Sequence, residues 1–177
     1  MKIKQAGDLN RKTVEEFRNS EKFPVIVLLE NVRSMHNVGS VFRTADAFLI
    51  SGIWLCGYTP RPPHRDIHKT ALGATDTVPW RYFEQASDAV ASLKEAGFAV
   101  YAVEQVETSI PLNEFSVEPG QKTAVVFGNE VSGVSPELLQ GCSGSIEIPQ
   151  FGMKHSLNVS VAAGIVLWHL AGRLTGR

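Results

Sequence analysis

The sequence contains very little cysteine. Cys56 and Cys142 are its only two, they lie far apart, and neither belongs to a Cys-x-x-Cys pair. Neither a disulfide framework nor a zinc knuckle is indicated, and a reducing, cytoplasmic location is expected. His64 and His68 are four residues apart but have no cysteine or carboxylate pair beside them, so we expect no metal site.

An excess of charge of one sign is also missing. The chain carries 17 Lys and Arg residues against 18 Asp and Glu residues, which gives a formal net charge of -1. This balance excludes a strongly basic surface that coats nucleic acid, but it permits a local basic patch. No apolar run approaches the roughly 20 residues of a membrane span, and the N-terminal residues lack the apolar core of a signal peptide. We expect no membrane segment.

The chain does contain short apolar runs, rich in β-branched residues, that alternate with helical patterns. The apolar runs cover residues 25–29, 53–56, 98–103, 123–127 and 145–148, and the helical patterns cover residues 37–49, 84–96, 136–140 and 157–174. This alternation predicts an α/β protein with a parallel sheet and helices on both faces. With 177 residues, 44% of them hydrophobic, we expect a single domain over residues 1–177, in which residues 1–23 form an N-terminal helix or arm.

Two segments have an unusual composition. The last helical pattern is apolar almost all round and carries the small residues Ala162, Ala163 and Gly164, so this helix is either central to the core or shared with another subunit. The connection between Tyr58 and Trp80 is proline-rich and then basic, and we expect a long loop there. Its cationic side chains predict a patch that contacts RNA phosphates, with a solvated loop as the alternative; they are Arg61, Arg65, His68 and Lys69.

The first of three strand-loop-helix segments holds Asn37 and Arg43. Asn37 stands where a helix is expected to begin, so it is either an N-cap or a site residue. At 100° per residue, Arg43 falls opposite the apolar stripe and is predicted at the same end of the helix as Asn37. That end faces the carboxyl edge of the sheet, where α/β proteins bind ligands, and a solvated arginine is the alternative.

The second and third segments also combine small and polar residues. Gly128 ends a strand and would let a ligand approach the backbone closely, and Glu130 follows two residues later. No Walker loop and no Gly-x-Gly-x-x-Gly is present, which disfavours nucleotide hydrolysis and ordinary dinucleotide binding. Ser156 and Asn158 flank Leu157 at the start of the last helix, where free N–H groups favour an anion or a polar ligand edge; a capping serine is compatible with that role.

In order and spacing, these segments resemble the three motifs of the SpoU branch of the SPOUT superfamily, the TrmH-like RNA ribose 2′-O-methyltransferases. The matching motifs are Asn-x-Gly-x-x-x-Arg-Thr-Ala from Asn37, Phe-Gly-Asn-Glu-x-x-Gly-Val from Phe127, and Ile-Pro followed by Ser-Leu-Asn-Val-Ser-Val-Ala-Ala from Ile148. The likeness runs from about Pro24 to Leu170. It implies a parallel sheet with a C-terminal trefoil knot, a homodimer, and an S-adenosylmethionine-dependent enzyme that methylates a ribose 2′-hydroxyl in tRNA or rRNA.

The resemblance also implies roles for single residues. Arg43 would be the catalytic arginine, Asn37 and Glu130 would support the active site, and Ser156 and Asn158 would order it. The expected cofactor-binding residues are Val103, Glu104, Gly128, Ile148, Met153 and Leu157. Because a guanidinium is a poor proton acceptor near neutral pH, we expect Arg43 to fix the adjoining phosphate and stabilise oxyanion charge. The acceptor of the hydroxyl proton stays open between phosphate, water and a deprotonated arginine.

Two other functions stay open at this point. One is a non-catalytic RNA-binding or assembly factor of the same fold, and the other is an RNA base methyltransferase. Many members of this family carry an additional N-terminal RNA-binding domain, whereas only about 23 residues precede the first strand here. We therefore expect structured RNA to be recognised by the core, by residues 61–69 and by the partner subunit.

Overall fold

The computed structural model describes residue 3 and residues 12–175. The described residues form a seven-stranded sheet in the order β3-β2-β1-β6-β4-β7-β5, and all neighbouring strands run parallel. The strands are β1 (Phe23–Glu30), β2 (Ile50–Cys56), β3 (Trp80–Phe83), β4 (Ala99–Val103), β5 (Ile110–Pro111), β6 (Thr123–Phe127) and β7 (Gly144–Glu147). The predicted α/β class is confirmed.

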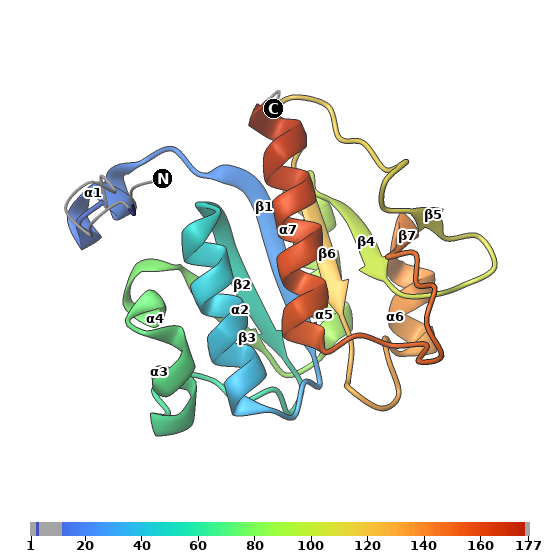
Figure 1. Ribbon diagram of the computed structural model, residues 1–177, viewed down its shortest axis with the longest axis horizontal. Coiled ribbons are helices and arrows are strands. Elements are labelled where there is room, and N and C mark those ends of the chain that lie inside the picture. The colour runs from blue at the N-terminus through green and yellow to red at the C-terminus, as the bar shows by residue number, and fades with distance from the viewer. Residues whose placement is uncertain (1–2, 4–11, 176–177) are drawn as a thin grey trace.

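Helices cover both faces of this sheet (Figure 1). They are α1 (Val14–Asn19), α2 (Met35–Ala47), α3 (Arg65–Ala71), α4 (Ala74–Thr77), α5 (Ala86–Glu95), α6 (Pro136–Gly141) and α7 (Val159–Thr175). The apolar residues of α2, α3, α4 and α7 share one buried cluster, and those of α5 and α6 share the other. The central strands β1 and β6 are buried on both faces, which explains their nearly continuous apolar sequences.

The strand order places one edge of the sheet beside several loops. From β1 the chain moves outward through β2 to β3, and it then returns across the sheet to β4 on the other side of β1. Such a reversal separates the loops that follow neighbouring strands and leaves a crevice outside their carboxyl ends. The three sequence motifs follow β1, β6 and β7 along the chain.

The connection between Tyr58 and Trp80 is not the long loop that was expected, because it contains α3 and α4. These helices are short, seven and four residues, so each shows too few turns for a clear period. Gly39 explains how closely α3 lies against α2: a Cβ there would overlap Thr70 Oγ1 and the Ile67 carbonyl. Strands β3 and β5 are likewise absent from the sequence prediction, since they have only four and two residues.

Two predicted helix starts are displaced by two residues. Ser34, not Asn37, caps α2, because its side chain accepts a hydrogen bond from the Asn37 N–H at 3.2 Å. The last helix begins at Val159, not at Leu157. At the N-terminus, α1 begins at Val14 after a Thr13 capping box, and residues 1–2 and 4–11 of the predicted arm lie outside the described residues.

Within the described residues, no helix combines the length and the apolar character that a bilayer crossing requires.

Candidate active site

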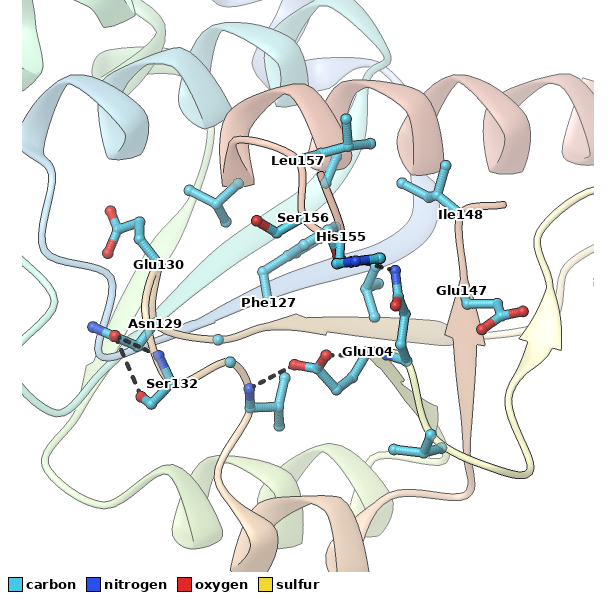
Figure 2. A pocket seen from close by; sticks show the side chains of 18 of the residues that line it. Glu104, Phe127, Asn129, Glu130, Ser132, Glu147, Ile148, His155, Ser156 and Leu157 are labelled. Atoms are coloured by element: carbon cyan, nitrogen blue, oxygen red, sulfur yellow. Dashed lines mark hydrogen bonds between the residues drawn. The ribbon is translucent and has the colours of Figure 1, made fainter. Parts of the chain in front are cut away.

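A cleft of about 450 Å³ lies at the carboxyl ends of β4, β6 and β7. Figure 2 shows Glu104 and Leu157 on opposite sides of the segment from Phe127 to Asn129. The lining residues are Val103, Glu104, Gln105, Val106, Phe127, Gly128, Asn129, Glu130, Val131, Ser132, Gly133, Val134, Leu139, Ile146, Glu147, Ile148, Gln150, His155, Ser156, Leu157, Val159 and Ala162. Most of them belong to loops, so backbone groups form much of the wall.

The loop after β6 closes tightly on itself. The Asn129 N–H donates to the Gly133 carbonyl at 3.0 Å, and the Gly133 N–H donates back to the Asn129 carbonyl at 2.9 Å. A Cβ on Gly128 would overlap the Gly133 carbonyl and the Val134 nitrogen. The closure of the loop itself therefore requires that residue 128 has no side chain. The sequence prediction considered only the close approach of a ligand to Gly128.

Glu104 joins this loop to the end of β4. Its carboxylate accepts hydrogen bonds from the Val134 N–H and the Gln105 N–H, both at 3.0 Å. Gly133 has a positive φ of 69°, and a Cβ there would overlap the Glu104 carboxylate. Glu104 thus fixes one wall of the cleft by holding backbone groups of two loops.

A chain of hydrogen bonds connects the three motif segments. Asn37 Nδ2 donates to Glu130 Oε1 at 3.1 Å, and Asn158 Nδ2 donates to Asn37 Oδ1 at 3.1 Å. The Glu130 carboxylate also accepts the backbone N–H groups of Arg33 at 2.9 Å and Ser34 at 3.0 Å. The start of α2, the loop after β6 and the segment before α7 are therefore held in one arrangement, which we call the Glu130–Asn37–Asn158 network.

The electrostatic state of Glu130 follows from these bonds. Burial raises its pKa, but hydrogen bonds from the Arg33 N–H, its own N–H, the Ser34 N–H and the Asn37 side chain lower it more. The pKa of this carboxyl consequently lies below its ordinary value. A carboxylate stabilised in its charged form is a weak base, so the geometry suits positioning better than proton removal.

The lowered pKa of Glu130 predicts a pH dependence of stability. Its charged form contributes stability at pH values above the unfolded carboxyl value of about 4.3, and this contribution is lost as the pH falls through the lower folded value. Glu130→Gln is expected to reduce the free energy of unfolding at neutral pH by about 0.2–1 kcal/mol, the range for exposed, screened charge interactions. Denaturant unfolding at several pH values checks this. The difference from the wild type should vanish in acid, and exposed Glu84→Gln is the control; a constant difference contradicts the assignment.

Asn158 is the residue that caps α7. Its carbonyl accepts the N–H groups of Val161 at 3.0 Å and Ala162 at 2.9 Å, and its Oδ1 accepts the Ser160 N–H at 2.9 Å. Ser156, the expected cap, instead lines the cleft on its exposed rim. Because the helix starts two residues later than predicted, the capping and network roles fall on the same asparagine.

Arg43 lies elsewhere than the sequence prediction placed it. It is the ninth residue of α2, six residues after Asn37, and so about 9 Å further along the helix axis. Its side chain is exposed, as expected opposite the apolar stripe. Among the described residues, Arg43 is not one that lines the cleft. The Cα–Cβ bond of a helical residue tilts toward the helix N-terminus, which is the end of α2 where Asn37 lies.

The expected cofactor-binding residues are mostly brought together. Val103, Glu104, Gly128, Ile148 and Leu157 all line the cleft. In contrast, Met153 is 83% exposed and is not among the lining residues that the structure describes.

The expected phosphate-contacting residues belong to two elements. Arg65, His68 and Lys69 are exposed on α3, where Lys69 forms an ion pair with Asp66 at 2.7 Å. Arg61 precedes this helix, and its guanidinium lies 4.0 Å from the centre of the Tyr82 ring.

Sequence reasoning missed several residues that shape the site. Gln105 Nε2 donates to the His155 carbonyl at 3.2 Å and so links the loop after β4 to the segment before α7. Glu30 is buried at the end of β1, where its carboxylate accepts the Ser135 N–H at 2.9 Å and the Ser135 hydroxyl. The sequence offered one signal for Glu30, because a charged residue there ends an apolar strand. This strand, β1, pairs with β6, which leads into the second motif.

Burial disfavours the reactive thiolate form of both cysteines. Burial, with a smaller contribution from Glu30, raises the pKa of Cys56 to about 12. Burial also raises the pKa of Cys142 to about 11, against the opposing effect of Lys94. Both thiols stay protonated near neutral pH, so covalent catalysis through cysteine is disfavoured. In the described part of the chain, no three His, Cys, Asp or Glu residues gather as a metal site.

The parallel sheet and its loop-built cleft define an α/β protein that binds a small molecule at the carboxyl edge of its strands. Residues 24–168 match the SpoU rRNA Methylase family, and the chain belongs to that family.

Known proteins of related sequence and structure agree with this assignment. The chain is 36% identical, over 94% of its length and 84% of the relative's, to the tRNA (guanosine(18)-2′-O)-methyltransferase of Thermus thermophilus. The crystal structure of the A. aeolicus TrmH/SpoU tRNA modifying enzyme matches with a TM-score of 0.80 and 29% identity, over 92% of this chain and 81% of that one. The AdoMet-bound rRNA methyltransferase from Sinorhizobium meliloti matches with a TM-score of 0.79 and 29% identity, over 89% of this chain and 59% of that one.

Proposed function

We propose that this protein is an S-adenosylmethionine-dependent methyltransferase that modifies a ribose 2′-hydroxyl in tRNA or rRNA. The single observation that carries the proposal is the Glu130–Asn37–Asn158 network, which joins the three family motifs and reaches the cleft through Glu130. Relatives of this sequence are named for the same reaction, and a structural neighbour has AdoMet bound.

The cleft suits the cofactor in size and in chemistry. Its volume of about 450 Å³ is within the usual range for ligand pockets. Val103, Ile148 and Leu157 offer apolar surface for a planar base, and the loop around Gly128 brings backbone groups to its wall. When bound, S-adenosylmethionine supplies a methyl group carried on a positively charged sulfur. Glu104 and Glu130, two carboxylates on the lining, make the site electrostatically compatible with that cation.

The protein's own contribution to catalysis is positioning. Holding the 2′-hydroxyl in line with the methyl carbon converts a bimolecular reaction into an effectively unimolecular one. Glu130, Asn37 and Asn158 keep the loops in the geometry that this alignment needs. Arg43 contacts the adjoining RNA phosphate and stabilises negative charge on the attacking oxygen. Because the Glu130 carboxylate already accepts three hydrogen bonds, the hydroxyl proton leaves to another acceptor.

The test is transfer of a labelled methyl group from S-adenosylmethionine to tRNA and rRNA fractions that lack native modification, with nucleoside mass spectrometry of the product. A 2′-O-methylnucleoside in one fraction establishes reaction and substrate class. A methylated base overturns the ribose assignment. Cofactor binding without transfer points to a missing substrate or partner, whereas the absence of both transfer and cofactor binding favours a non-catalytic assembly factor.

We also propose that the protein works as a homodimer through α7. Val161, Ile165 and Trp168 are 51%, 37% and 69% exposed, and their spacing places them on one side of the helix. The opposite side is buried in the core. An apolar stripe of this kind is typical of a surface that a second subunit covers.

The dimer proposal predicts that Trp168→Glu yields monomers, because the charge would be buried without a partner in the interface. Sedimentation velocity over a range of protein concentrations measures this. Val14→Glu, which changes a 48% exposed valine on α1, should leave the association state unchanged. Equal association of wild type and Trp168→Glu contradicts the assignment.

Two architectural proposals accompany the function. We propose that the segment between β7 and α7 completes a trefoil knot. Its support is that this segment passes from β7, beyond β4, to α7 beside α2, with contacts to Gln105 and Asn37 on the way. Single-molecule stretching tests it, since a knotted chain stays shorter than its full contour length.

We further propose that residues 1–177 act as one domain, as burial of Phe17 from α1 in the main core suggests. Separate unfolding transitions would contradict this.

The remaining proposals concern the cellular location of the protein and its contacts with RNA. We propose a cytoplasmic location, because both cysteines are free, as is usual in a reducing compartment. Cell fractionation tests this location. Arg61, Arg65, His68 and Lys69 are proposed to contact phosphates of structured RNA, so that affinity falls with rising salt.

A further inference from the structure

Two exposed tyrosines and an arginine lie together at the carboxyl ends of β2 and β3. Tyr58 follows β2 and is 61% exposed, and Tyr82 in β3 is 37% exposed. The Arg61 guanidinium covers the Tyr82 ring at 4.0 Å from its centre. We call these three residues the Tyr58–Arg61–Tyr82 strip. It offers flat aromatic and guanidinium surface to solvent, whereas phosphate contacts alone need only positive charge.

Tyr58 is held at its backbone and at its side-chain hydroxyl. Its backbone N–H donates to Asn31 Oδ1 at 3.2 Å, and its hydroxyl accepts a hydrogen bond from Asn129 Nδ2 at 2.9 Å. Asn31 itself has a positive φ of 54°. An exposed aromatic ring that is fixed in this way cannot fold back onto the protein surface. It is preorganised for a flat ligand, which reduces the entropy lost on binding.

The strip is connected to the active-site loops. Asn129, which holds the Tyr58 hydroxyl, immediately precedes Glu130 of the network. The Tyr82 hydroxyl donates to the Gly57 carbonyl at 3.0 Å, so both rings are attached to the same turn. One hydrogen bond therefore joins the Tyr58 side chain to the loop that carries Glu130.

We propose that the Tyr58–Arg61–Tyr82 strip is a stacking platform for unpaired bases next to the methylated ribose, so that the substrate is a single-stranded or loop segment of RNA. This inference rests on the RNA substrate proposed above. Bases that are splayed out of a helix stack on aromatic rings and on arginine planes, whereas a duplex hides the faces of its bases. Arg65 and Lys69, which follow Arg61 in the chain, are placed to contact the phosphates between such bases.

The Tyr58 ring and the Tyr58 hydroxyl can be tested separately. Tyr58→Ala is expected to raise the Kd for an RNA hairpin by roughly 5- to 150-fold, the effect of losing one base stack, with cofactor affinity unchanged. Tyr58→Phe keeps the ring and loses the bond to Asn129, so it should bind the hairpin somewhat more weakly than the wild type, because the ring is less preorganised, but much more tightly than Tyr58→Ala. If phenylalanine is as harmful as alanine, Tyr58 only supports Asn129 and the platform is overturned.

The probes are an RNA hairpin with a single-stranded loop and a fully paired duplex of the same composition, each tested for binding over a range of salt concentrations. The wild type should prefer the hairpin, and Tyr58→Ala should lose that preference with no change in salt dependence. Lys69→Ala should instead reduce the slope of log affinity against log salt by about 0.7–1. Equal wild-type affinity for hairpin and duplex overturns the platform. If the wild type binds neither RNA, the proposed function itself fails.

A matched arginine pair provides the control. Arg61→Ala removes the cation over Tyr82 and is expected to weaken hairpin binding. Arg81→Ala removes another exposed arginine, whose guanidinium lies 5.6 Å from the centre of the Trp54 ring. Arg81 and Tyr82 are adjacent in β3 and so point to opposite faces of the sheet. Equal effects of the two substitutions indicate general electrostatics and overturn the platform.

Discussion

Replacing Arg43 with alanine is expected to lower kcat by about 10²–10³-fold, the range for losing one donor that stabilises a developing oxyanion. The affinity for S-adenosylmethionine should stay unchanged, because Arg43 lies outside the residues that line the cleft. Single-turnover methyl transfer with saturating RNA measures the chemical step, and equilibrium binding measures cofactor affinity. An unchanged kcat contradicts a catalytic role for Arg43, whatever happens to the KM for RNA.

Arg43→Lys separates charge from shape. A lysine retains the positive charge but lacks the planar fork that binds phosphate with two parallel hydrogen bonds. We expect this variant to remain strongly impaired, and near-full turnover would count against fork-shaped phosphate recognition. Arg81→Ala is the control for loss of an exposed arginine on another element, and it should behave as the wild type does in this assay.

Gly128→Ala is expected to have the largest effect on the fold of the site. The added Cβ would overlap the Gly133 carbonyl and the Val134 nitrogen, which are backbone atoms and cannot rotate away as a side chain can. We expect a loss of about 3 kcal/mol in the free energy of unfolding, at the upper end for single substitutions. This corresponds to a Tm lower by about 6–12 °C. Cofactor binding should be lost with the loop geometry, and calorimetry measures both quantities.

Gly141→Ala is the matched control for this prediction. Gly141 ends α6, and a Cβ there would meet only Val90 Cγ1 at 3.6 Å, an ordinary contact. This variant should unfold at nearly the wild-type temperature and bind the cofactor normally. If Gly128→Ala is equally benign, the tight closure of the loop on Gly133 is not essential, and Gly128 serves another purpose.

The sequence predicted the components of the site better than their positions. Asn37, Glu130 and Asn158 were recognised from motifs, yet Asn37 is 93 residues from Glu130 and 121 residues from Asn158 along the chain. Helix starts were placed two residues late for α2 and two residues early for α7. Such an error is small for a helix but decisive for a site, because Asn158 and not Ser156 caps α7, and Asn37 lies inside the first turn of α2 and not at its cap.

Short elements were the other source of error. Helices α3 and α4 were expected as loop, since elements of seven and four residues show no clear period. The predicted phosphate-contacting residues are consequently divided, with Arg61 stacked on Tyr82 and Lys69 paired with Asp66. Nothing in the sequence pattern indicated the bond between Asn129 and Tyr58, because a turn residue and a strand-end tyrosine carry no periodic signal.

By itself, the sequence determined that this is a parallel α/β protein, because buried strands require continuous apolar runs and amphipathic helices between them. It also determined the family and the reaction class, because the three motifs occur in order and in full. Only the tertiary structure decided which motif residues touch, why Gly128 must lack a side chain, and that exposed aromatic surface lies beside the network. The physical reason is that hydrogen bonds and steric contacts between distant segments depend on strand order and register, which local patterns do not encode.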